Sequence, residues 1–166
     1  MSILLREYNP LWPELFEREA ERIRHVAGGR VLRLEHVGST SVRGLVAKPV
    51  IDIVLEVVDS ADEAGYAPAL EAAGYVIRIR EPDWFAHRML KGSDPDVNLH
   101  VFSAGCPEIE RMLKFRDRLR SDDADRELYA RTKRELAQRE WGCVQDYADA
   151  KSVVVAEILS RCRDII

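Results

Sequence analysis

The sequence predicts an α+β fold, with a mixed β-sheet, flanking helices and a helical C-terminal portion. Three observations lead to this class. Strand-like runs fall within residues 31–103, long helical patterns fill residues 107–166, and neither an internal repeat nor a linker separates the two parts. We therefore expect one domain over residues 1–166, with a sheet-containing core at 1–105 and a mainly helical part at 106–166.

The elements of the first half follow from spacing and turn residues. Prolines, apolar residues at helical spacing and a terminal Gly-Gly pair predict an amphipathic helix over residues 10–29. Alternation predicts a strand at 31–37, and the most apolar run of the chain predicts another at 49–58. A cap-like serine, acidic residues and an alanine-rich run predict a helix over residues 60–74.

The elements of the second half are separated by turn and breaker residues. We expect the last two of three further strands to pair as a hairpin. Beyond residue 107, breaks near 121–123 and 141–142 divide the helical pattern. The three strands are expected at residues 75–80, 84–91 and 97–103.

The composition indicates a protein that folds by itself in water. It is 46% hydrophobic and 33% charged, and the net charge of -4 favours binding to neither nucleic acid nor an anionic membrane. Cys106, Cys143 and Cys162 have neither disulfide-framework nor zinc-type spacing. With no signal peptide or membrane span in the pattern, we expect a cytoplasmic protein with reduced thiols.

A small hydroxyl-rich turn precedes the apolar strand. Gly38 can adopt conformations closed to other residues, and the hydroxyls and free N–H groups of Ser39, Thr40 and Ser41 can surround a phosphate. Lys48 adds a cation at the entrance of the strand, unless it is an ordinary surface lysine.

The strand itself carries a carboxylate. Asp52 alternates with apolar residues and so points to the polar face, together with Val54 and Glu56. Near a phosphate, such an acid would need a divalent cation, with Mg²⁺ as the natural choice. The plainer alternative is that Asp52 is solvated or paired with an arginine.

Two histidines are candidates to join this carboxylate. If their strands are adjacent, His36, Asp52 and His100 converge on one pocket, as metal ligands or as a His-Asp acid–base pair. The alternative is three separate polar residues. The other histidines, His25 and His87, have no comparable context, and we expect them to be surface or core residues.

Six segments, in order along nearly the whole chain, resemble the GrpB family. They are PLWPELFEREA at 10–20, EHVGSTSV at 35–42, GLVAKPVIDIVLEV at 44–57, NLHVF at 98–102, LKFRDRLR at 113–120 and ELYARTKRELA at 127–137. The resemblance implies a fold similar to the nucleotidyltransferase superfamily, whose signature is a Gly-Ser turn, a strand with two carboxylates and a third acid on a later strand. The chain also resembles a domain that is fused to dephospho-coenzyme A kinase in some proteins.

Carried over to this sequence, the resemblance is incomplete. Gly38 and Ser39 match the turn and Asp52 matches the first carboxylate, but Val54 stands where the second belongs. His100 stands in place of the third acid. The implied metal is Mg²⁺ or Mn²⁺, or a transition metal if histidines are ligands.

The helical half contributes further candidates for substrate binding, and they lie in the segments that resemble the GrpB family. Tyr129 and Lys133 are four residues apart on one helix face, so they can stack on a base and neutralise a phosphate. Arg116 is a third candidate for substrate binding. The alternative is a solvated helix with paired charges.

Three hypotheses about function follow. The first is a metal-dependent transfer of a nucleotidyl or phosphoryl group to or from a small substrate, with Asp52 and His100 in catalytic roles. The second is a non-catalytic module that binds or senses a nucleotide or a coenzyme A derivative. The third is a structural or partner-binding protein in which the polar pocket is incidental. A small nucleotide or phosphorylated ligand is expected, without a membrane or nucleic-acid partner.

Overall fold

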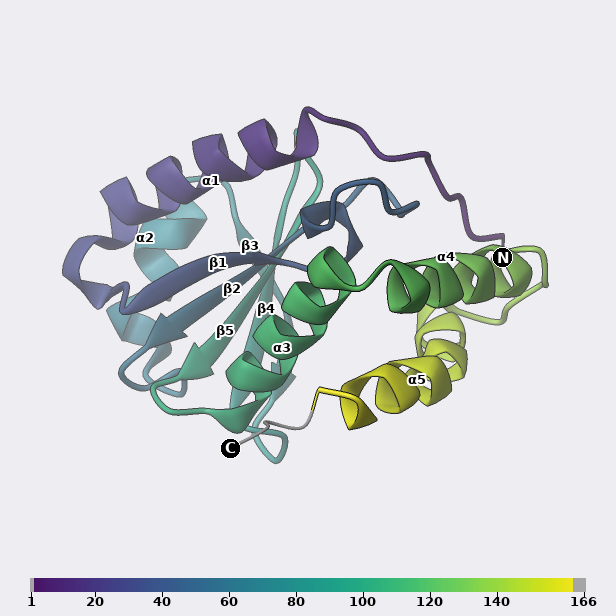
Figure 1. The fold of residues 1–166 in the computed structure, drawn as a ribbon. Coiled ribbons are helices and arrows are strands. Elements are labelled where there is room, and N and C mark those ends of the chain that lie inside the picture. Colours follow the sequence, from purple (N-terminus) through teal and green to yellow (C-terminus); the bar gives the residue numbers. More distant parts are fainter. Residues whose placement is uncertain (1, 163–166) are drawn as a thin grey trace.

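The computed structural model describes residues 2–162, which form a five-stranded mixed sheet with helices on both faces (Figure 1). The strands lie in the order β1-β2-β5-β4-β3. Their bounds are β1 Arg33–Val37, β2 Ile51–Val57, β3 Val76–Glu81, β4 His87–Gly92 and β5 Val97–Ser103.

The pairing of the strands decides which side chains become neighbours. In the centre of the sheet β2 and β5 run parallel, whereas the pairs β1–β2, β5–β4 and β4–β3 are antiparallel. The register places Asp52 beside Asn98 and Val54 beside His100. Because directly paired residues point to the same face of a sheet, these four side chains share one face.

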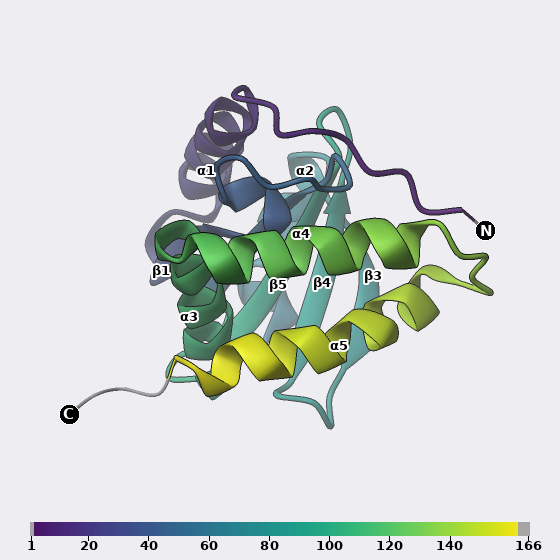
Figure 2. The same ribbon diagram turned by 45° about the vertical axis from the view of Figure 1, so that its right-hand side comes forward.

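The helices divide between the two faces. The helix α1 and the short α2 pack on the apolar residues Ile51, Ile53 and Leu55, while α3 packs on the other face against Val54 and Phe102. The helices α4 and α5 lie next to each other in front of the sheet (Figure 2). The bounds are α1 Trp12–Ala27, α2 Ala67–Ala72, α3 Pro107–Ser121, α4 Asp123–Ala137 and α5 Val144–Ser160.

The predicted α+β class is confirmed, and so are the hairpin of β4 and β5 and the division of the C-terminal part into helices. The breaks near residues 121–123 and 141–142 separate α3, α4 and α5. The Asp122 side chain caps α4 by accepting a hydrogen bond from the Asp125 N–H at 2.8 Å. None of the helices in residues 2–162 is both long and apolar enough to cross a membrane.

Most element boundaries lie within two residues of the prediction, and two differ by more. The helix expected over residues 60–74 is a 3₁₀ turn followed by the six residues of α2. Its α-helical part begins where Pro68 fits, because a proline needs no N–H there. The Ser60 hydroxyl does not cap a helix, and instead bonds the Ala86 carbonyl at 2.7 Å.

The second difference concerns the start of β4. The run expected from residue 84 begins as a strand only at His87. Phe85 and Ala86 have φ angles of 56° and 50°, which are incompatible with an extended strand. Trp84 and Phe85 therefore lie in a turn that precedes the strand.

Candidate functional site

The main candidate site is a cavity of about 440 Å³ on the face of the sheet that bears Asp52. We call it the Asp52 pocket. Its lining comes from the turn after β1, the strands β2 and β5, and the helices α4 and α5. The polar residues of the lining are Ser39, Thr40, Lys48, Asp52, Asn98, His100, Lys133, Gln145, Tyr147 and Lys151.

Gly38 allows the turn to lie against the carboxylate. Its φ angle is 72°, and a Cβ atom at this position would overlap the Asp52 carboxylate. A larger residue would therefore be strained twice, by its backbone conformation and by the contact with Asp52. The glycine predicted from the Gly-Ser turn is thus required by close approach to the strand.

The turn is held from the opposite side by an amino group. Lys133 Nζ donates hydrogen bonds to Ser39 Oγ and to the Val46 carbonyl, both at 2.6 Å. Lys133 is only 2% exposed. Burial, reinforced by the charge of Lys151, lowers the pKa of Lys133 well below its usual range.

A second lysine reaches the pocket from α5. Burial is the main reason that the pKa of Lys151 falls to about 8, and the charge of Lys48 lowers it further. The charge of Asp52 acts in the opposite direction. Lys48, Lys133 and Lys151 therefore line one cavity in which Asp52 is the carboxylate. An entering anion would favour the charged form of an amino group there.

A buried hydroxyl lies at the same pocket. Tyr147 of α5 lines the cavity, and its Oη is the buried side-chain polar atom without a hydrogen-bond partner in the described part of the chain. Burial raises the pKa of Tyr147 to about 12, so the hydroxyl remains a potential donor. Such a group normally finds a partner.

On the sheet, Asp52 and His100 lie at one end of a chain of polar contacts. His100 Nε2 is 3.4 Å from Asp52 Oδ1, and His100 Nδ1 is 3.1 Å from His87 Nε2. His87 Nδ1 is in turn 2.7 Å from Glu81 Oε1. His87 is 4% exposed, and burial lowers its pKa.

His36 does not join Asp52 and His100, although β1 and β2 are adjacent as expected. It pairs with Ile53 in the register, so it points to the opposite face, where its ring stacks on Phe16 at 4.8 Å. His36 Nε2 lies 2.9 Å from Thr40 Oγ1, which itself donates to the Val50 carbonyl at 3.1 Å. The Thr40 hydroxyl is thus committed to the fold.

The protein side chains do not fit a tightly held metal ion. Within residues 2–162 no group of three or more His, Cys, Asp or Glu side chains is arranged to hold one. Glu56 is bound to Arg33 at 3.3 Å, so it does not supply the missing second carboxylate. One carboxylate and one imidazole are a poor match for the octahedral oxygen ligands of Mg²⁺.

Two candidates from the helical half lie outside the pocket. Tyr129 is 5% exposed and its ring packs edge-on against Phe115, so its position does not support stacking on a base. Arg116 is bound to Glu35 and Asp117 at 2.9 Å each. It ties α3 to β1, and Lys133 is the residue of this set that lines the pocket.

Sequence reasoning missed the contributions of α5 and of His87. Lys151 and Tyr147 are four residues apart, which is a signal that they share a helix face, but nothing in the sequence shows that this face meets Asp52. His87 was expected to be a plain core or surface residue. The register that sets Met89 opposite His100 brings His87 beside it.

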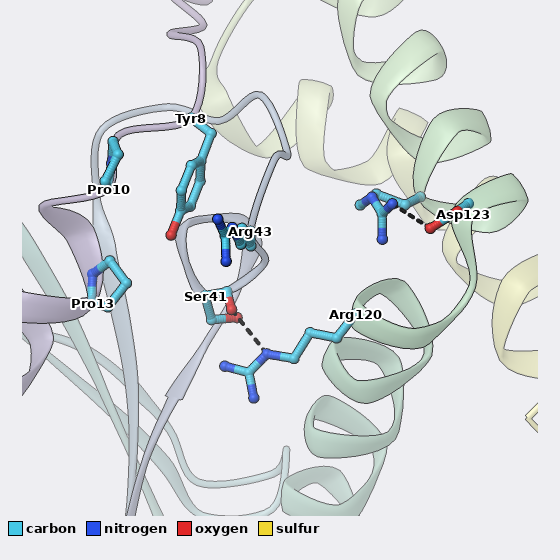
Figure 3. Close-up of a pocket in the computed structure, with 8 residues that line it drawn as sticks. Tyr8, Pro10, Pro13, Ser41, Arg43, Arg120 and Asp123 are labelled. Carbon is cyan, nitrogen blue, oxygen red and sulfur yellow. Dashed lines mark hydrogen bonds and ion pairs between the residues drawn. The ribbon is translucent and has the colours of Figure 1, made fainter.

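A larger and more open pocket, of about 940 Å³, lies on the other side of the Ser39–Ser41 turn. We call it the arginine pocket, because Arg43, Arg120 and Arg126 line it (Figure 3). Figure 3 shows Arg120 bonded to the Ser41 carbonyl and one further guanidinium paired with Asp123. Arg43 is exposed and Arg126 is paired with Asp123, although burial lowers the pKa of Arg120 here as well. The Asp52 pocket, smaller and lined by a carboxylate, an imidazole and three lysines, is the stronger candidate.

The fold and the site define a class of protein: an α+β domain with an enclosed, lysine-rich pocket between a sheet face and two C-terminal helices. The GrpB protein family model matches residues 2–161, so the chain belongs to the GrpB family. The resemblance carried by the six sequence segments is thereby confirmed.

Relatives and a solved structure agree with this assignment. A UPF0157 protein of Halalkalibacterium halodurans is 64% identical over 96% of this chain and 82% of the relative. The crystal structure of the conserved protein GrpB from Enterococcus faecalis has a TM-score of 0.82 at 30% identity, covering 97% of this chain and all of that one. A dephospho-CoA kinase of Mycolicibacterium paratuberculosis is 31% identical over 86% of this chain and 42% of the kinase.

Proposed function

We propose that this GrpB-family protein binds the phosphate groups of a small nucleotide or coenzyme A derivative in the Asp52 pocket. The observation that carries the proposal is that three lysines, Lys48, Lys133 and Lys151, line the cavity together with a single carboxylate, that of Asp52. Burial of cations without matching acids is unfavourable in the free protein. A bound polyphosphate would reverse that cost.

Further features of the pocket support the same ligand class. Its volume of about 440 Å³ lies in the range of small-molecule sites. Apolar side chains such as Ile79 and Met89 also line the cavity and would contact the uncharged part of the ligand.

The choice of probes follows from the relatives. Some proteins with a similar segment are dephospho-CoA kinases, but this chain spans 42% of the Mycolicibacterium protein, whose name therefore supports only the testing of such ligands. We would titrate ATP, coenzyme A and inorganic triphosphate into the protein by calorimetry, with and without EDTA. Binding that persists in EDTA is expected, because lysines rather than a metal hold the phosphates.

Matched variants separate the two pockets. The double variant Lys48→Met and Lys151→Met should weaken binding of the best probe at least tenfold, about 1.4 kcal/mol. The control, Arg43→Met with Arg126→Met in the arginine pocket, should leave it unchanged. The proposal is wrong if no probe binds the wild type, or if the arginine variant and not the lysine variant loses binding.

A second candidate function is transfer of a nucleotidyl or phosphoryl group. The observation that favours it is that Asp52 and His100, 3.4 Å apart, lie in the same cavity as the lysines. A divalent cation, if required, would depend on the phosphates for most of its ligands, since the protein offers so few.

The test is product formation. Wild-type protein and Asp52→Asn would be incubated with ATP and either Mg²⁺ or Mn²⁺, and released pyrophosphate and phosphate would be measured. Metal-dependent release that is lost in Asp52→Asn supports transfer. Binding without any release, in every condition, supports a binding or sensing module instead.

A further inference from the structure

Four side chains on the site face form a continuous chain of three contacts. From the rim to the pocket, Glu81, His87, His100 and Asp52 are linked at 2.7, 3.1 and 3.4 Å. Of the two inner members, His87 is almost fully buried, and its ring stacks on Phe102 at 4.8 Å. The two ends are carboxylates, and both inner members are imidazoles.

Counting protons shows that one of the three contacts is not a hydrogen bond when both histidines are neutral. Carboxylates accept hydrogen bonds and cannot donate them, so each contact needs one proton on a ring nitrogen. Two neutral imidazoles carry two protons for three contacts. The contact left without a proton should be the longest one.

The distances identify that contact. The links of 2.7 and 3.1 Å lie within the normal range for hydrogen bonds, whereas the 3.4 Å between His100 Nε2 and Asp52 Oδ1 lies beyond it. His87 then donates from Nδ1 to Glu81 and accepts at Nε2. His100 donates from Nδ1 to His87, and its Nε2 keeps a free lone pair.

We propose that Glu81 and His87 are positioning residues that hold His100 in its Nδ1–H tautomer, with the Nε2 lone pair facing the Asp52 pocket. His100 Nε2 and Asp52 Oδ1 then form a pair of adjacent acceptors. Such a pair suits a ligand group that donates a hydrogen bond, such as a sugar hydroxyl, rather than a phosphate. This last step rests on the proposed function, whereas the tautomer does not.

The tautomer can be measured in the ligand-free protein. Long-range ¹H–¹⁵N NMR of protein labelled in histidine, at a pH where the rings are neutral, distinguishes protonated from unprotonated ring nitrogens. We expect a protonated Nδ1 and an unprotonated Nε2 for His100. His87→Leu removes the acceptor for Nδ1–H, so the His100 proton should move to Nε2 and donate to Asp52.

Two more variants keep the test decisive if His87→Leu does not fold. His87→Gln offers an amide oxygen to His100 and an N–H to Glu81, so it should preserve the wild-type tautomer. Glu81→Ala removes the outer acceptor and should increase the Nε2–H population of His100. The control is His25→Leu on the exposed side of α1, which should change nothing at His100.

Two results would overturn the proposal: a protonated Nε2 on His100 in the wild type, or a His100 tautomer unaffected by both His87→Leu and Glu81→Ala. Neither result depends on ligand binding. Failure of the lysine variants to alter phosphate binding would therefore disprove the proposed function and leave this inference standing, and the reverse holds as well.

Discussion

The Ser39–Ser41 turn separates two basic pockets that differ in how their charges are held. Ser39 and Thr40 face the Asp52 pocket, and Ser41 faces the arginine pocket. In the first, burial lowers the pKa values of two of the three amino groups, those of Lys133 and Lys151, whereas in the second it lowers that of Arg120. In the second, Arg126 is paired with Asp123 at 2.5 Å and the cavity is twice as large and more open.

The difference shows that positive charge alone does not mark a binding site. An exposed guanidinium is solvated or paired and loses little in the free protein. A buried amine without a matching acid destabilises the free protein, and a bound anion relieves that cost. The smaller pocket is therefore the functional candidate, although the larger one carries as many basic residues.

The largest expected effect comes from the turn that divides the pockets. Gly38→Ala should destabilise the fold by about 3 kcal/mol, because the added methyl group meets Asp52 at a positive φ. Chemical denaturation would measure the change. Gly29→Ala is the matched control, since a Cβ atom there meets nothing within 4 Å; an equal loss in both variants would contradict the role of Gly38.

The same turn should be sensitive to acid through His36, which bonds Thr40. Burial lowers the pKa of His36 from 6.5 to about 4. The unfolded chain therefore binds a proton between pH 6.5 and 4 that the native state does not, so stability is present above pH 6.5 and is lost as the pH falls toward 4.

We expect this linkage to be worth about 2 kcal/mol at pH 4.5. Melting temperatures at pH 7.5 and 4.5 would measure it. His36→Phe keeps the stacking on Phe16 and should reduce the difference between the two pH values. His25→Phe is the control, and an unchanged difference in His36→Phe would show that another group is responsible.

The variant Lys151→Met tests whether this lysine lowers the stability of the free protein and strengthens phosphate binding. Lys151→Met should add on the order of 1 kcal/mol of stability and so raise the melting temperature, because it removes a half-buried cation whose pKa is lowered. The same variant should weaken phosphate binding about tenfold. In the wild type, affinity should fall as the pH rises above about 8, where Lys151 loses its proton. A variant that is less stable yet binds normally would contradict both expectations.

The smallest effect is expected in the arginine pocket. Arg43→Met should change the affinity for ATP or coenzyme A by less than twofold and stability by less than about 0.5 kcal/mol, because the side chain is exposed. Calorimetry and thermal unfolding would measure both quantities. A tenfold loss of affinity would show that the ligand extends across the turn. The proposal that only the Asp52 pocket binds the ligand would then be wrong.

Sequence patterns predicted the strand β2 and its polar Asp52, because alternation between the faces of a strand is a local property. They also predicted the Gly-Ser turn and Lys133 as site residues, through the family resemblance. The boundaries of α2 and β4 were less accurate, since a single proline and two positive φ angles decided them.

The sequence by itself determined the fold class, the family, and the polar edge formed by Gly38, Ser39 and Asp52. Only the tertiary structure decided which partners meet that edge. It turned His36 toward α1, enclosed Tyr129, and brought Lys151 and His87 to the site. Strand order, register and the packing of α5 depend on contacts between distant parts of the chain, and local residue patterns do not contain them.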